Sequence, residues 1–123
     1  MTAAEAAFAT IADRLLREPA VDEGTGFGAN PGLRVGGRIF AMLVRDQLVL
    51  KLPADRCEVL VFADAAVPFD RGQGRPLREW VVVSAEIEPD WPALARESLE
   101  FVRGATPPRR GRDSARARSS RRR

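Results

Sequence analysis

The side chains with the clearest capacity for chemistry in this sequence are arginines, which supply 19 of its 20 basic residues. Guanidinium groups bind phosphates and carboxylates through charge-assisted hydrogen bonds. Eight arginines fall within residues 106–123 against one acidic residue, which makes the net charge of this segment +7. Such a segment favours non-specific, salt-sensitive contact with nucleic acid. Its candidate phosphate-binding residues are Arg109, Arg110, Arg112, Arg116, Arg118, Arg121, Arg122 and Arg123.

A second basic cluster comprises Arg71, Arg75 and Arg78, which lie within eight residues of one another. We predict that these three side chains form an interaction surface. The alternative is that they are solvated loop charges, some of them paired with Asp70 and Glu79. A GC-rich coding sequence would also raise the arginine content without any selection for binding.

The residue types needed for common catalytic machinery are missing. The sequence contains no histidine, no tyrosine and one cysteine, Cys57. This composition excludes Ser-His-Asp and Cys-His catalysis, a Cys/His zinc site and an internal disulfide. The carboxylates are scattered and form no spaced pair suited to acid–base work. We therefore predict that the protein is not an enzyme and uses no cofactor, and that Cys57 is a small buried apolar group.

Composition divides the chain into a folded body and a tail. Residues 1–105 carry 12 basic and 16 acidic residues, a net charge of −4, and the whole chain is 45% apolar. Residues 106–123 have no apolar side chain large enough to pack, so we predict one domain over 1–105 and a disordered Arg-rich tail. No apolar run reaches about 18 residues and no signal peptide is recognisable, which favours a cytoplasmic protein.

The segment that organises the body is residues 33–52, where three apolar runs are separated by Gly36-Gly37 and Arg45-Asp46. Two-residue turns of this kind predict three antiparallel strands joined by tight hairpins. Strict alternation would place Ile39 with Ala41 and Leu43 on one face of the middle strand. Phe40 would then share the opposite face with Met42 and Val44.

Helices and shorter strands surround this segment. We predict helices over residues 3–17, 53–63 and 91–103, a glycine-rich loop over 22–32 pinned by Phe27, and strands over 67–70 and 80–84. Thr2 and Glu5 are placed to form a capping box, Asp90 to cap the last helix, and Gly104 to end it. The predicted fold class is α+β, an antiparallel sheet of about five strands with an N-terminal helix and two further helices packed on it.

Five pieces of the sequence, in this order, resemble the N-terminal domain of TfoX/Sxy-type proteins. They are Phe27-Gly28, the hairpin segment GGRIFA at 36–41, LKLP at 50–53, GRPLREW at 74–80, and the last helix. The MmcQ/YjbR-like family, with a similar hairpin and a Trp-led strand, is the second choice. The resemblance spans roughly residues 8–102 and implies a role in competence gene regulation, DNA-associated or co-regulatory, with no catalytic residues to carry over. Longer TfoX/Sxy proteins have a second, C-terminal domain, and this chain has an Arg-rich tail in its place.

Two functions follow as hypotheses. The first is a small regulatory domain that associates with DNA through its Arg-rich tail. The second is a protein–protein interaction module with no direct nucleic-acid role, in which the loop at residues 24–31 and the arginines of residues 71–78 contact a regulatory protein. A third hypothesis is an enzyme or a small-ligand binder, which a ligand-dependent thermal shift would test.

Overall fold

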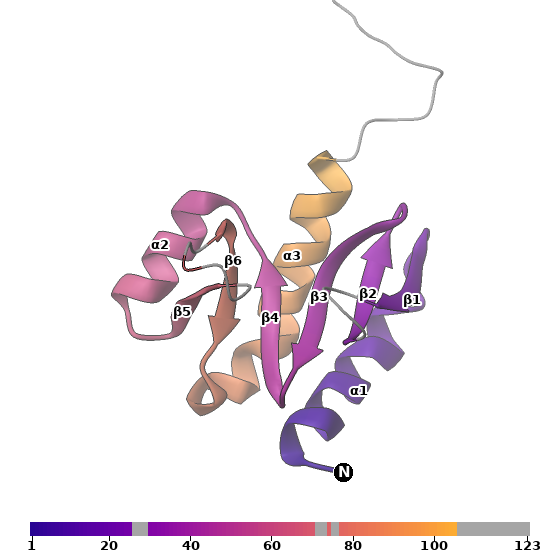
Figure 1. Cartoon of the computed structure of the whole chain (residues 1–123). Coiled ribbons are helices and arrows are strands. Elements are labelled where there is room, and N and C mark those ends of the chain that lie inside the picture. The colour runs from indigo at the N-terminus through magenta and orange to yellow at the C-terminus, as the bar shows by residue number, and fades with distance from the viewer. Residues whose placement is uncertain (26–29, 71–73, 75–76, 106–123) are drawn as a thin grey trace, which may run out of the picture.

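The computed structural model describes residues 1–25, 30–70, 74 and 77–105, and it confirms the predicted α+β class. A single antiparallel sheet has six strands in the order β1-β2-β3-β4-β6-β5, one more than the sequence suggested. Figure 1 shows α1 and α3 lying behind this sheet and α2 beside β5 and β6. The elements are α1 (Ala3–Leu15), β1 (Val21–Thr25), β2 (Pro31–Val35), β3 (Arg38–Val44), β4 (Gln47–Lys51), α2 (Ala54–Phe62), β5 (Ala66–Phe69), β6 (Leu77–Val83), the 3-10 helix η1 (Ala85–Asp90) and α3 (Trp91–Ala105).

Both predicted hairpins are present. Gly36 and Gly37 have φ angles of +58° and +83°, the left-handed values that a two-residue turn between β2 and β3 requires. Arg45 and Asp46 reach φ angles of +50° and +64° without the help of glycine, and they connect β3 to β4. The Val44–Gln47 pair closes this second hairpin.

The predicted faces of β3 are wrong at its beginning because the strand contains a β-bulge. Leu33 of β2 pairs with Ala41 and Arg34 pairs with Ile39, so Phe40 is an extra residue on β3. Phe40 therefore lies on the same face as Ala41 and Leu43, whereas Ile39 lies with Met42 and Val44. Both faces of the strand are apolar, as predicted, but the first two side chains have exchanged sides.

The glycine-rich loop predicted over residues 22–32 is also partly wrong. Its first residues form the edge strand β1, which pairs with β2 from Val21–Val35 to Thr25–Pro31, and residues 26–29, with Phe27, lie outside the described residues. Gly32 permits close approach of the strands, since a Cβ there would come within 2.9 Å of the Ala41 carbonyl oxygen. Glycine is used here for packing between strands, which sequence pattern alone does not distinguish from a loop.

The helix caps match the predictions at α1 and differ at α3. Thr2 and Glu5 form the capping box, and α1 ends two residues earlier than predicted. The last helix begins at Trp91, as predicted, but Asp90 is the final residue of η1 directly before it, and the Ser84 side chain caps η1 by accepting from the Glu86 amide. The α3 helix extends to Ala105, so Gly104 lies within it and is not its end, contrary to the prediction.

Two apolar clusters occupy opposite faces of the sheet. The helix-side cluster joins residues of all three α-helices to strand residues such as Leu48 and Leu50, and the strand-side cluster contains Met42, Val49 and Trp80. The α3 helix is tied to the sheet by Ser98, which is fully buried and lies 2.6 Å from each of the Phe40 and Lys51 carbonyl oxygens. The Phe40 carbonyl belongs to the bulged residue, so Ser98 supplies a donor where the sheet is irregular.

Candidate interaction groove

Of the arginines predicted to bind a partner, the structure describes Arg78 alone. Arg71, Arg75 and all eight tail arginines fall in residues 71–73, 75–76 and 106–123, outside the described residues. The prediction of a loop is wrong at Arg78. This residue lies near the start of β6, and its side chain is exposed. Because Arg78 belongs to a strand, the backbone of β6 sets the side from which its side chain projects relative to α2.

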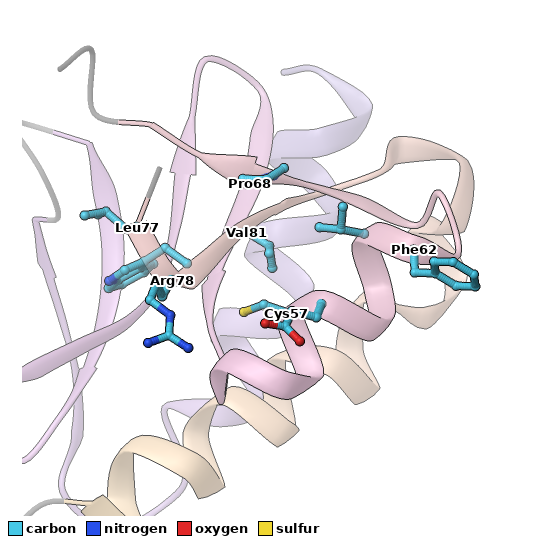
Figure 2. A pocket seen from close by; sticks show the side chains of 9 residues that line it. Cys57, Phe62, Pro68, Leu77, Arg78 and Val81 are labelled. Carbon is cyan, nitrogen blue, oxygen red and sulfur yellow. The ribbon is translucent and has the colours of Figure 1, made fainter. Parts of the chain in front are cut away.

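Arg78 lines an apolar groove between α2 and the β5–β6 pair (Figure 2). The groove has a volume of about 430 Å³, within the usual range for binding pockets of roughly 300–1,000 Å³. One wall comes from α2 and the other from the two strands. The lining residues are Cys57, Glu58, Val61, Phe62, Pro68, Leu77, Arg78, Trp80 and Val81.

An irregular strand pairing shapes the second wall of this groove. The register runs from Pro68–Val81 directly to Phe69–Leu77, so residues 78–80 of β6 fall between two neighbouring pairs of β5. Extra residues on one strand increase its local bend and redirect its side chains. Trp80 belongs to the strand-side cluster and Val81 to the helix-side cluster, yet both line the groove.

The first wall follows from the amphipathic pattern of α2. Cys57 and Leu60 are buried against the sheet, and the next turn places Val61 and Phe62 along the groove. Phe62 is 93% exposed at the last residue of the helix. Figure 2 shows Arg78 and Phe62 at opposite ends of the lining residues, with the Phe62 ring pointing away from the others.

Several exposed large apolar side chains belong to the elements that border this groove. Within the described residues, those exposed are Met1 at the chain terminus and Val59, Phe62 and Val67, which belong to α2 and β5. The sequence contains a signal for the exposure of two of these side chains, because Val59 and Phe62 lie off the Cys57–Leu60 face of the helix. Their exposure is decided by the way α2 packs on the sheet, which only the tertiary structure shows.

Five of the nine arginines in the described residues form ion pairs, and Arg78 at the groove is one of the four that do not. Across the described body, arginines commonly pair with carboxylates, such as Arg34 with Asp22 at 2.7 Å and Arg56 with Glu97 at 2.9 Å. Glu79, a predicted partner of the basic cluster, instead lies 4.0 Å from Lys51, whose amine sits 5.8 Å from the Trp80 ring. Neither the Arg78 side chain nor the Glu58 side chain forms an ion pair or hydrogen bond with another described residue, and both residues are exposed.

The thiol in the groove is not activated. Cys57 is buried, and its thiol donates a hydrogen bond to the Leu52 carbonyl oxygen at 3.5 Å. Burial raises the pKa of the Cys57 thiol, the opposite of what a nucleophilic thiolate needs. Over the described part of the chain, Cys, Asp and Glu side chains nowhere gather in a group of three or more that would hold a metal ion.

None of the described helices combines the length and apolar character needed to cross a bilayer. Comparison of the chain with protein-family models, with curated proteins and with solved structures found no match.

Proposed function

We propose that this protein is a non-catalytic binding domain whose α2 groove receives a partner protein. The observation that carries the proposal is the position of Phe62, an exposed aromatic residue at the end of α2 and among the residues that line an apolar groove. Exposed apolar patches cost solubility, and those beside a groove mark interaction sites. Aromatic side chains at such positions supply much of the free energy of association.

The charge distribution of the described body supports a protein partner over a nucleic acid. Residues 1–105 have a net charge of −4, which repels a phosphate backbone. Arginines of α3 are already engaged in ion pairs. The guanidinium nitrogens of Arg96 and Arg103 lie 3.1 and 3.3 Å from the carboxylate oxygens of Glu18. The groove itself is lined mostly by apolar side chains, which protein partners bury more readily than nucleic acids do.

The likeness to TfoX/Sxy-type N-terminal domains makes this binding domain a regulatory one in our proposal. We place it in the cytoplasm, in keeping with its free cysteine, Cys57. The absence of an enzyme activity belongs to the same proposal. It is supported by the lack of histidine in the chain and by the raised pKa of the Cys57 thiol.

Two surface variants test the protein-binding role. Phe62→Ser removes the exposed ring, and the triple change Arg71→Glu, Arg75→Glu and Arg78→Glu reverses the basic cluster. Cross-linked partners would be quantified by mass spectrometry against Arg38→Glu, an exposed control residue at the start of β3. We expect both groove variants to lose the same partner at an unchanged melting temperature. Equal capture by all variants would refute the groove as the contact surface, and a large fall in melting temperature would show a structural role.

The Arg-rich tail favours a second candidate function, non-specific association with nucleic acid. Its eight arginines would release counterions from phosphates, so affinity should fall steeply with salt. Fluorescence anisotropy of a labelled duplex, measured at two salt concentrations with the full chain and with residues 1–105, tests this. Binding by the full chain alone supports the tail as the anchor. Binding that survives in residues 1–105 would contradict it.

A further inference from the structure

We infer that the groove binds a free α-amino acid with a large apolar side chain, whose carboxylate pairs with Arg78 and whose ammonium group pairs with Glu58. This inference rests on the proposed function, because it names a small molecule that regulates partner binding at the same groove. It follows from two unpaired charges of opposite sign on facing walls and from the apolar interior between them.

The two charged side chains that line the groove have no partners, whereas their charged neighbours along the chain do. Arg56 of α2 and Glu79 of β6 form ion pairs, at 2.9 and 4.0 Å, with residues that do not line the groove. Glu58 and Arg78 are exposed, and neither side chain forms an ion pair or hydrogen bond with another described residue. Local packing therefore engages the charges beside the groove and leaves open those that border it.

Glu58 and Arg78 carry opposite charges on facing walls and still do not pair with each other. An occupant with a carboxylate alone would leave Glu58 facing a like charge, and an occupant with a cation alone would do the same to Arg78. A zwitterion supplies a charge-assisted hydrogen bond to each wall. Because it has no net charge, the net charge of −4 on residues 1–105 neither attracts nor repels it.

The interior of the groove suits the side chain of such a molecule. Its volume of about 430 Å³ lies in the lower part of the usual range for small-molecule sites, roughly 300–1,000 Å³. Val61 and Leu77 line it from the two walls, together with Cys57 and Trp80, which are 5% and 8% exposed (Figure 2). Apolar surface of this kind favours burial of a branched or aromatic side chain.

These features favour a free amino acid over a segment of polypeptide. A free amino acid holds its carboxylate, its ammonium group and its side chain on one carbon atom, so one small molecule reaches both walls and the interior. A residue inside a chain has neutral amide groups in place of the two charges. Because the amino acid and the partner protein bury the same lining, binding of one excludes the other.

Isothermal titration calorimetry of the full chain with L-leucine and L-phenylalanine tests the inference. The matched ligands are N-acetyl-leucine, which lacks the ammonium group, leucinamide, which lacks the carboxylate, and L-alanine, which lacks the large side chain. We expect each of these three to bind about tenfold or more weakly than L-leucine, as expected for loss of a charge-assisted contact or of buried apolar surface.

Two variants assign each charge of the ligand to its wall. Arg78→Gln should bind L-leucine no better than leucinamide, and Glu58→Gln should bind it no better than N-acetyl-leucine, because each variant lacks the group that the removed charge contacts. Arg38→Gln, the same change on a distant strand, should leave the affinity for L-leucine within about twofold. Both groove residues are exposed, so their replacement does not disturb the core.

The inference and the proposed function fail separately. If neither amino acid binds, if the matched ligands bind equally well, or if Arg78→Gln and Glu58→Gln leave affinity unchanged, the inference is overturned and the proposed function stands. Saturating L-leucine should also lower the capture of the cross-linked partner by the original chain, and unchanged capture would overturn the regulatory role. If Phe62→Ser captures as much partner as the original chain, the proposed function is overturned, and the titrations still decide the ligand.

Discussion

Replacing Ser98 by alanine tests how α3, the central helix behind the sheet, is held in place. The Ser98 side chain is fully buried, with its hydroxyl oxygen 2.6 Å from both the Phe40 and the Lys51 carbonyl oxygens. One hydroxyl proton serves both acceptors, and its removal leaves both carbonyl oxygens without this donor. Leaving buried acceptors without a donor costs about 1–3 kcal/mol. Alanine recovers about 0.5 kcal/mol through its higher helix propensity.

The cost exceeds the recovery, so we expect Ser98→Ala to lower the free energy of unfolding by about 1.5 kcal/mol. For a domain of this size, that corresponds to a fall in melting temperature of roughly 6–12 °C. Urea unfolding followed by the fluorescence of Trp80 and Trp91 measures the change. The matched control is Ala93→Ser on the exposed side of the same helix, which should cost no more than about 0.5 kcal/mol. A Ser98→Ala protein within 0.5 kcal/mol of the original, by the same propensity scale, would refute the reasoning.

Three further changes have distinct expected outcomes. Trp80→Ala removes a ring that is 8% exposed and should cost about 3–5 kcal/mol in urea unfolding; a value below 1 kcal/mol would contradict its packing role. Gly37→Val should cost about 1–3 kcal/mol from the positive φ alone, since a Cβ there meets nothing, whereas Gly37→Asn should be nearly neutral. Because its pKa is raised, Cys57 should react with iodoacetamide more slowly in the folded chain than in urea, and should need a higher pH; equal rates would argue against burial.

Much of the candidate site was beyond reach of the sequence. Arg78 was selected because it lies in a basic cluster, and the alternative was that some arginines of this cluster pair with Asp70 and Glu79. In the structure Glu79 lies by Lys51, and Arg78 faces the groove opposite Glu58. The groove depends on the register change between β5 and β6, and pairing register between distant strands leaves no local mark in the sequence.

Local physics accounts for what the sequence determined by itself. Gly36 and Gly37 adopt the positive φ angles of a tight turn, and Thr2 and Glu5 form a capping box three residues apart. Because these interactions are local, short-range sequence patterns predict the β2–β3 hairpin and the start of α1. Only the tertiary structure decided the side to which Phe40 turns, the pairing of β1 and the exposure of Phe62. These three features depend on which apolar surfaces, far apart in the sequence, bury one another. That choice is made only when the helices pack on the sheet.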